Sequence, residues 1–278
     1  MNTRAHLLVI DAYDAAGRTS LVSKGVTPAG SLYARAIAGV DATVTTDVVR
    51  FGEPGEELPA DLGRYDGIVW TGSNLTVHKP NESVEVQLEL VRSAFAAGIP
   101  QFGSCWAIQI AAVAAGGACA RNPRGREFGI GRSITVTAEG RDHPMLRGRP
   151  DVFEGFVSHE DMVVELPPGA VHLAGNDFCA VQALEVRHGS GVFWAVQYHP
   201  EYDFHEVARL AALRGEQLVR EGRFGDFDEA EAFVAEYERL HRDPDEGELR
   251  RRHRVPAEVL DPALRGIELR NWIGSLRR

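Results

Sequence analysis

The first 115 residues alternate short, mostly apolar runs with stretches in which apolar residues recur at helical spacing. The apolar runs are 7–10, 67–71 and 99–102, and helical spacing is seen over 31–38 and 83–97. Such a short apolar run is typical of a strand buried on both faces, and the intervening helices make each connection long enough for parallel pairing. This order predicts a doubly wound α/β sheet with right-handed crossovers.

The second half of the chain is predicted to be mostly β and to end in helices. Strands are expected over 130–137, 152–157, 180–186 and 191–198, and a helix over 204–222. The Gly-, Ser- and Thr-rich segment 14–30 is expected to be a loop. From residue 222 the composition becomes more charged, and Asp261-Pro262 is typical of the start of one further helix. We therefore expect a main domain over 1–221 and a helical C-terminal extension over 222–278.

Composition restricts the class of protein. The chain has 278 residues, of which 44% are hydrophobic and 25% charged, as in an ordinary globular protein. A formal net charge of -10 argues against a main role in binding nucleic acid or an anionic membrane. No apolar segment approaches the roughly 18 residues that span a bilayer. The three cysteines, Cys105, Cys119 and Cys179, lack paired spacing, so we expect no disulfide, no metal site and a cytoplasmic location.

One cysteine stands where an apolar run meets a helical pattern. Residues 99–109 read Ile-Pro-Gln-Phe-Gly-Ser-Cys-Trp-Ala-Ile-Gln, so Cys105 lies between a predicted strand and a helix that starts at Trp106. A turn of this kind exposes the nucleophile of α/β enzymes, and the positive end of the helix favours the thiolate. A lone cysteine is more often a buried small hydrophobe. The nucleophile hypothesis therefore requires a base elsewhere in the chain.

A histidine that could act as this base follows the last predicted strand. His199 stands in Val-Gln-Tyr-His-Pro-Glu, where Pro200 fixes the following backbone and Glu201 can turn back toward the imidazole. Cysteine, histidine and carboxylate supply a nucleophile, its base and the group that orients the base. A histidine at a strand end is often structural. Together with the cysteine turn, however, it favours a triad of Cys105, His199 and Glu201.

Several stretches resemble, in the same order, the class I glutamine amidotransferases, and among them the amidotransferase domain of GMP synthetase. They are Ile-Val-Trp-Thr-Gly-Ser-Asn at 68–74, Gly-Ser-Cys-Trp-Ala-Ile-Gln at 103–109, Arg-Glu-Phe-Gly at 126–129, Ser-His-Glu-Asp at 158–161 and Val-Gln-Tyr-His-Pro-Glu at 196–201. The resemblance implies a flavodoxin-like, mostly parallel sheet flanked by helices. The C-terminal extension lies outside it.

The resemblance also implies a reaction. Cys105 would attack the side-chain carboxamide of glutamine, and the backbone N–H groups of Ser73 and Trp106 would hold the oxyanion. A glutamyl thioester would form; His199 would protonate the departing ammonia and then activate the water that releases glutamate. The residues implied for substrate binding are Gly72, Gln109, Glu127, Ser158, His159, Glu160 and Asp161. No cofactor is implied.

Three positions depart from the family's pattern. Ala107 replaces a glycine after the cysteine turn, Ser73-Asn74 replaces Gly-Pro in the oxyanion loop, and Glu160 replaces a glycine in the substrate loop. Ala107 narrows the space between helix and strand, and serine tolerates positive φ less well than glycine. Glu160 adds negative charge near the expected α-carboxylate contact. These changes bear more on which substrate is bound than on the type of reaction.

The sequence is compatible with three functions. The first is a glutaminase that hands ammonia to a synthetase on another chain, because no Gly-rich phosphate loop for ATP is present. The second is a stand-alone γ-glutamyl hydrolase or peptidase that acts on another γ-glutamyl amide. The third is a non-catalytic binding module on the same fold. The C-terminal helices are expected to dock on the main domain or on a second copy in a homo-oligomer, without nucleic acid or membrane partners.

Overall fold

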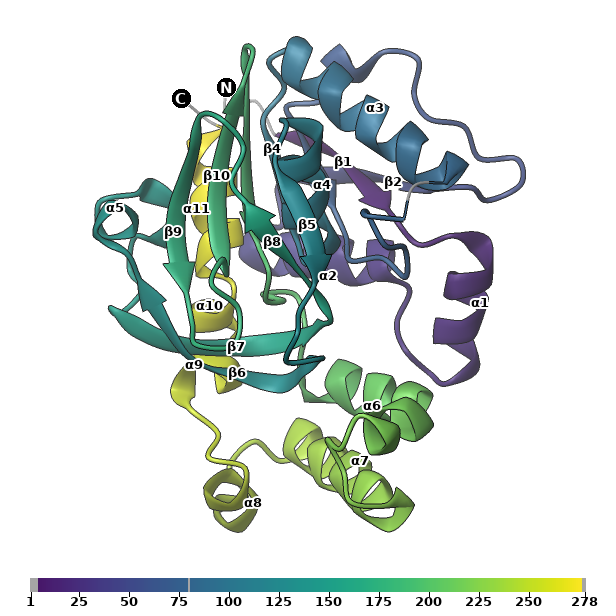
Figure 1. The fold of residues 1–278 in the computed structure, drawn as a ribbon, viewed down its shortest axis with the longest axis vertical. Coiled ribbons are helices and arrows are strands. Elements are labelled where there is room, and N and C mark those ends of the chain that lie inside the picture. The colour runs from purple at the N-terminus through teal and green to yellow at the C-terminus, as the bar shows by residue number, and fades with distance from the viewer. Residues whose placement is uncertain (1–4, 80, 277–278) are drawn as a thin grey trace.

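The sheet is mostly parallel and lies at the centre of the molecule (Figure 1). The structure is a computed structural model that describes residues 5–79 and 81–276. In these residues nine strands pair in the order β2-β1-β3-β4-β11-β10-β9-β6-β7. The parallel strands are β1 (His6–Asp11), β2 (Thr45–Arg50), β3 (Gly67–Trp70), β4 (Gln101–Ser104) and β11 (Gly191–Val196). The antiparallel strands are β6 (Glu127–Val136), β7 (Val152–His159), β9 (Ala170–Gly175) and β10 (Ala183–His188). The doubly wound sheet predicted from the sequence is confirmed.

Helices flank this sheet, and a small second sheet lies beside it. The larger helices are α1 (Ala15–Ser23), α2 (Ala29–Val40), α3 (Glu82–Ala96), α4 (Trp106–Ala114), α6 (Phe204–Arg220), α7 (Phe227–Arg242) and α11 (Ile267–Ser275). The shorter helices are α5 (Ala138–Arg141), α8 (Gly247–Arg252), α9 (Ala257–Leu260) and α10 (Pro262–Arg265), with single 3-10 turns at Leu62–Arg64 and Pro144–Leu146. The second sheet pairs β5 (Ala118–Arg121) with β8 (Asp161–Glu165).

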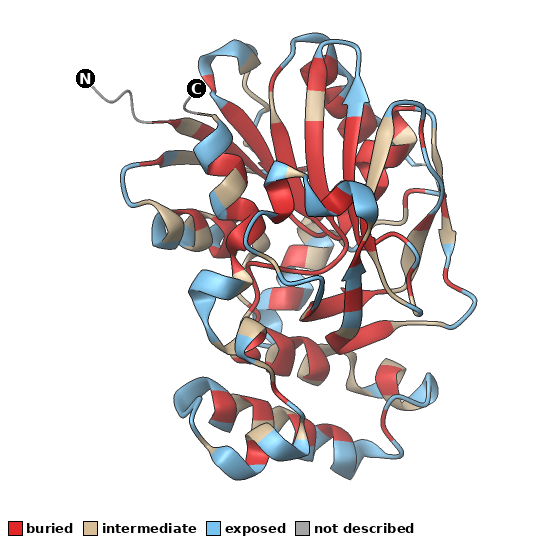
Figure 2. Cartoon of the chain, turned by 90° about the vertical axis from the view of Figure 1, so that its left-hand side faces the viewer, coloured by how far each residue is buried: buried red, intermediate tan, exposed pale blue. Residues whose placement is uncertain are grey.

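Alternate residues of the central strands pack on opposite faces of the sheet. Leu8 and Ile10 of β1 belong to the core under α3 and α4, whereas Leu7 and Val9 belong to the core under α2 and α11. All four side chains are completely buried, and burial of each is worth about 1.5–3 kcal/mol. Figure 2 shows the same pattern as nearly continuous burial along the central strands. The sheet is thus a rigid support for residues at its carboxyl ends.

The C-terminal helices predicted from the sequence are present, and they contact the main body in two places. Helix α7 packs along α6 in a third apolar core that also includes side chains of β6 and β7. Helix α11 returns to the sheet, where Trp272 lies against Phe102 of β4 with a ring separation of 5.5 Å. Figure 1 shows α7 and α8 at one end of the molecule and α11 alongside the strands. The last helix is therefore part of one face of the main core.

Several elements differ from the sequence-based expectation. The segment 14–30, expected to be a loop, contains α1, which Asp14 caps by accepting a hydrogen bond from the Gly17 amide at 2.6 Å. The single helix expected after Asp261 is divided into α10 and α11 at Gly266. Strands β5, β8 and β9 were not expected, because their short sequences mix polar and apolar residues without clear alternation.

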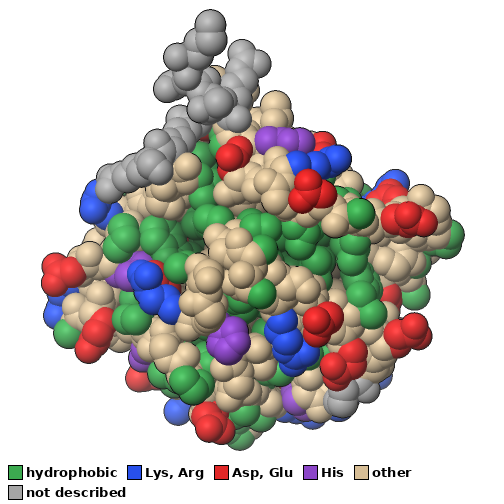
Figure 3. Space-filling model, turned by 90° about the horizontal axis from the view of Figure 1, so that it is seen from above, with side chains coloured by type: hydrophobic (Ala, Val, Ile, Leu, Met, Phe, Trp, Pro, Cys, Tyr) green, Lys and Arg blue, Asp and Glu red, His purple; other side chains and the backbone are tan. Residues whose placement is uncertain are grey.

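The surface of the described chain offers no membrane-spanning element: none of its helices combines the length and the apolar character needed to cross a bilayer. Figure 3 shows the end of the molecule near the two chain termini, where apolar side chains lie among both acidic and basic ones. On this face charges are interspersed, so it presents no large basic surface of the kind that binds nucleic acid.

Candidate active site

Cys105 occupies the sharp turn between β4 and α4. Its backbone has φ 55° and ψ -96°, an unfavourable conformation for a residue with a side chain. The Cys105 amide donates to the Val196 carbonyl at 2.8 Å, which ties the turn to the end of β11. Because α4 begins at Trp106, the positive end of this helix lies at the cysteine. This is the geometry of a strained nucleophile elbow.

The elbow requires a glycine at position 103. A Cβ on Gly103 would lie 2.3 Å from the Trp70 carbonyl oxygen and 2.6 Å from the Ala107 Cβ. Strand and helix therefore approach so closely that only one of the two positions can carry a methyl group. Ala107, which replaces the family's glycine, is accommodated because Gly103 has no side chain.

His199 and Glu201 lie beside the cysteine, because β4 and β11 are parallel neighbours and their carboxyl ends meet. The His199 Nδ1 and the Glu201 Oε1 are 2.7 Å apart, and both side chains are almost fully buried. His199 Nε2 is buried without a hydrogen-bond partner among the described protein atoms. Gly72 lies next to both residues: a Cβ added to it would be 3.3 Å from the His199 Cε1 and 3.9 Å from the Cys105 Cβ. The imidazole is thus oriented by Glu201 and adjacent to the thiol.

The charge state of His199 follows from its neighbours. Burial by itself would lower the pKa of the imidazole, but the Glu201 carboxylate and Cys105 outweigh burial and raise the pKa of His199 to about 9. The Tyr202 ring stacks on the imidazole with a centroid separation of 3.8 Å and an interplanar angle of 6°. A cationic, firmly held imidazole beside a thiol stabilises the thiolate that a nucleophile needs.

Ser104 contributes to this arrangement, although sequence reasoning did not assign it a role. Its completely buried hydroxyl donates to the Glu201 Oε1 at 2.8 Å, the same oxygen that faces His199. Both hydrogen bonds hold the carboxylate in one orientation. The residue was missed because a serine next to a turn cysteine has no distinguishing pattern.

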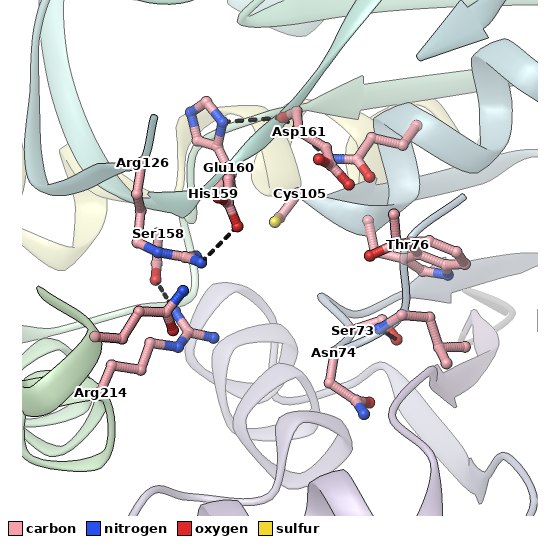
Figure 4. Close-up of a pocket in the computed structure, with 14 residues that line it drawn as sticks. Ser73, Asn74, Thr76, Cys105, Arg126, Ser158, His159, Glu160, Asp161 and Arg214 are labelled. Atoms are coloured by element: carbon pink, nitrogen blue, oxygen red, sulfur yellow. Dashed lines mark hydrogen bonds and ion pairs between the residues drawn. The ribbon is translucent and has the colours of Figure 1, made fainter. Parts of the chain in front are cut away.

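A polar cavity of about 260 Å³ opens next to Cys105 (Figure 4). The lining residues that the sequence predicts for the site are Ser73, Cys105, Trp106, Gln109, Ser158, His159, Glu160 and Asp161. The other lining residues, which the sequence does not assign to the site, are Asn74, Leu75, Thr76, Arg126, Arg214 and Gln217. A cavity of this size suits a ligand as small as an amino acid rather than a drug-sized molecule.

The expected oxyanion donors line this cavity. Trp106 is the first residue of α4, where a backbone N–H has no acceptor within the helix. The Ser73 hydroxyl donates to the Ala12 carbonyl at 2.8 Å and accepts from the Leu75 amide at 3.1 Å, which shapes the loop after β3. Neither Ser73 nor Asn74 has a positive φ, so the loss of the family's Gly-Pro pair imposes no backbone strain.

Glu127 lies behind the cavity and does not line it. Its carboxylate is within hydrogen-bond distance of the His159 Nε2 at 2.9 Å and accepts from Asn176 and Gln182, both at 2.8 Å. The opposite nitrogen of His159 lies 3.1 Å from the Asp161 carbonyl. Glu127 therefore contacts the predicted substrate loop through His159 without lining the cavity itself.

The charge that Glu160 adds to the loop is compensated. Its carboxylate forms ion pairs with Arg121 and with Arg126, the latter at 3.0 Å. Arg126 also contacts Glu221 at 3.3 Å. Glu160 therefore does not present a free negative charge to a ligand. Within the described residues, no group of three or more His, Cys, Asp and Glu side chains is arranged to hold a metal ion.

Comparison with known proteins agrees with this fold. The family profile "Glutamine amidotransferase class-I" matches residues 31–209, which is more than half of the chain. The protein thus belongs to the class I glutamine amidotransferase family.

Individual relatives differ in how much of the chain they match. A Pseudomonas protein named gamma-glutamyl-L-1-hydroxyisopropylamide hydrolase is 29% identical over 98% of this chain and 93% of its own length. A glutamine-hydrolyzing GMP synthase subunit of Methanoculleus marisnigri is 36% identical over 41% of this chain and 58% of its own length. The GMP synthase subunit of the same name in Ignicoccus hospitalis is 30% identical over 55% of this chain and 75% of its own length.

Solved structures share the fold over the whole chain. A glutamine amidotransferase from Thermotoga maritima superposes with a TM-score of 0.66 at 16% identity, covering 99% of both chains. A glutamine amidotransferase from Methylobacillus flagellatus gives a TM-score of 0.62 at 22% identity, covering 99% of this chain and 91% of the other. At these identities the similarity extends to architecture alone.

Proposed function

We propose that this protein is a cysteine hydrolase of γ-glutamyl amides, with Cys105 as nucleophile, His199 as acid and base, and Glu201 as the group that orients His199. The observation that carries the proposal is the Cys105 elbow beside a His199–Glu201 pair at 2.7 Å, at the edge of a polar cavity. The other charged residues of the cavity suit a ligand with an amino and a carboxylate group.

The proposed reaction proceeds in two halves. The Cys105 thiolate attacks the γ-carbonyl carbon, and the amide N–H groups of Ser73 and Trp106 bind the resulting oxyanion. His199 Nε2 gives its proton to the leaving nitrogen, the C–N bond breaks, and an amine and a γ-glutamyl thioester remain. Water then attacks the thioester while His199 takes its proton, and glutamate and the free thiolate are released.

The leaving group that we favour is a substituted amine, released without a partner chain. The support is the Pseudomonas hydrolase, whose similarity extends through the C-terminal helices to 98% of this chain. The two GMP synthase relatives match only 41% and 55% of it. A protein built like the hydrolase over its full length is expected to share its class of substrate.

A second candidate is the hydrolysis of glutamine to supply ammonia to a separate synthetase. It is supported by the family itself and by the similarity to the glutamine-hydrolyzing GMP synthase subunits. In this case the purified chain is expected to hydrolyse glutamine slowly, and a partner is expected to increase the rate.

One assay separates these proposals. Release of amine or ammonia is measured from γ-glutamyl alkylamides and from glutamine, with the purified protein and with its Cys105→Ala variant as control. We expect alkylamides to be hydrolysed at the higher kcat/KM and the variant to be inactive. Preference for glutamine that rises on addition of a synthetase would favour the second candidate. Equal activity of protein and variant would refute both.

A further inference from the structure

We propose that Arg214 of α6 binds the α-carboxylate of the γ-glutamyl group, so that only γ-glutamyl compounds with a free α-carboxylate are good substrates. This inference deepens the proposed function and rests on it. It assigns a specificity-determining role to a residue that lies outside the family's sequence motifs and that belongs to the helix following the His199 turn.

The position of Arg214 is the first support. Its side chain reaches from α6 into the cavity that contains Cys105 and donates a hydrogen bond to the Ser158 hydroxyl. Figure 4 shows Arg126, Ser158 and Arg214 on one side of Cys105, and Ser73 with Asn74 on the other, where the oxyanion loop lies. A γ-glutamyl group with its carbonyl at the oxyanion loop can therefore extend its α-carbon toward Arg214.

The charge of Arg214 is the second support. Among the residues that the structure describes, no carboxylate forms an ion pair with it, whereas the nearby Arg126 is paired with both Glu160 and Glu221. Burial, followed by the positive charge of Arg214, lowers the pKa of Arg126, so the two guanidinium groups lie within electrostatic reach. A guanidinium has five N–H donors, and a partly buried one without a counter-ion favours an anion.

The remaining cavity charges fit the other end of the same ligand. Glu160 is neutralised by arginines, which leaves Asp161 as the carboxylate of the cavity without an arginine partner. Its nearest basic group is His78, at 3.6 Å. An α-carbon between Arg214 and Asp161 would place its carboxylate by the first and its ammonium group by the second. No neutral acyl amide offers both charges.

The test compares two chromogenic substrates that differ only in the α-carboxylate, γ-glutamyl-p-nitroanilide and 4-aminobutyryl-p-nitroanilide. We expect Arg214→Gln to raise KM for the first about 10- to 100-fold with little change in kcat, as loss of a charge-assisted hydrogen bond predicts. The kinetics of the second should not change, because it lacks the group that Arg214 binds. Arg220→Gln, on the exposed side of the same helix, is the matched control and should leave KM and kcat unchanged for both substrates.

A binding measurement keeps this inference separate from the proposed function. Calorimetry of L-glutamine against the Cys105→Ala protein, with and without Arg214→Gln, reports carboxylate binding even if no hydrolysis occurs. Loss of glutamine affinity in the Arg214→Gln protein supports the inference whether or not the wild type is active. The inference would be overturned if Arg214→Gln raised KM equally for both p-nitroanilides, or if it left the glutamine affinity unchanged. Arg214 would then only support the Ser158 loop.

Discussion

At the level of single residues, the charge of His199 links catalysis to stability. Its pKa in the folded protein, about 9, lies above the ordinary value of 6.5. The protonated imidazole therefore contributes fully to stability below about pH 6.5, and this contribution is lost as the pH rises through about 9. A shift of this size corresponds to about 3 kcal/mol. The Glu201 carboxylate, at 2.7 Å, is the main attraction that opposes burial.

Replacement of Glu201 by Gln tests this coupling. The variant should unfold more easily than the wild type at pH 6, and the difference should shrink between pH 6.5 and 10, because the wild type loses its buried ion pair over that range. The rate constant kcat should fall by about 10²- to 10⁴-fold, since the imidazole loses its orienting anion. Urea unfolding at several pH values and steady-state kinetics measure both effects. An exposed-site variant, Glu216→Gln, is the control; a difference that stays constant with pH would contradict the assignment.

At the level of elements, helix α11 is joined to the short segment between β11 and His199. Its Glu268 is completely buried and accepts from Arg149 at 2.6 and 2.8 Å and from the Tyr198 hydroxyl at 2.7 Å. Tyr198 is the residue immediately before His199. The buried carboxylate is thus the acceptor that both the guanidinium and the phenol use, and Arg149 also donates to the Arg265 carbonyl at 2.9 Å.

Glu268→Gln is expected to lower the free energy of unfolding by about 3–5 kcal/mol, since it leaves the Arg149 charge buried and unpaired. Tyr198→Phe removes only one hydrogen bond to the carboxylate and should cost about 1–3 kcal/mol. Denaturant titration measures both. Arg270→Gln, at an exposed position of the same helix, should change stability by less than about 0.5 kcal/mol. If Glu268→Gln were as mild as Arg270→Gln, the buried network would not hold α11 to the sheet.

These elements also show which parts of the structure the sequence could predict. The buried strands β1 and β3 and the Cys105 elbow follow from local patterns, because strands buried on both faces are apolar throughout and the turn needs small residues. Helix α1 was missed since its Gly, Ser and Thr residues resemble a loop, although Asp14 caps it. Arg214 could not be predicted: it is one of several arginines on an amphipathic helix, and only the packing of α6 turns it toward Cys105. The role of Glu127 in substrate binding stays a prediction, and its carboxylate contacts His159, which lines the cavity.

At the level of the whole molecule, the C-terminal segment closes one face of the central sheet. Trp272 shares an apolar core with Leu7, Val69 and Phe102, which lie on three neighbouring strands, and its indole packs on Gly67, where a Cβ would come within 2.9 Å of the ring. β4, which leads directly to Cys105, is one of these strands. The helical extension and the main domain are therefore expected to fold together.

A chain shortened to residues 1–221 tests this expectation. Without α11 the apolar face that holds Phe102 would be open to water, so we expect the shortened chain to aggregate or to melt at a much lower temperature than the full chain. Trp272→Ala in the full chain should cost about 3–5 kcal/mol, because it leaves a cavity between α11 and the sheet. Thermal unfolding and size-exclusion chromatography report both effects, with the exposed Leu264→Ala as control. If the shortened chain kept the solubility, melting temperature and activity of the full chain, residues 222–278 would be a separable appendage rather than part of the fold that positions Cys105.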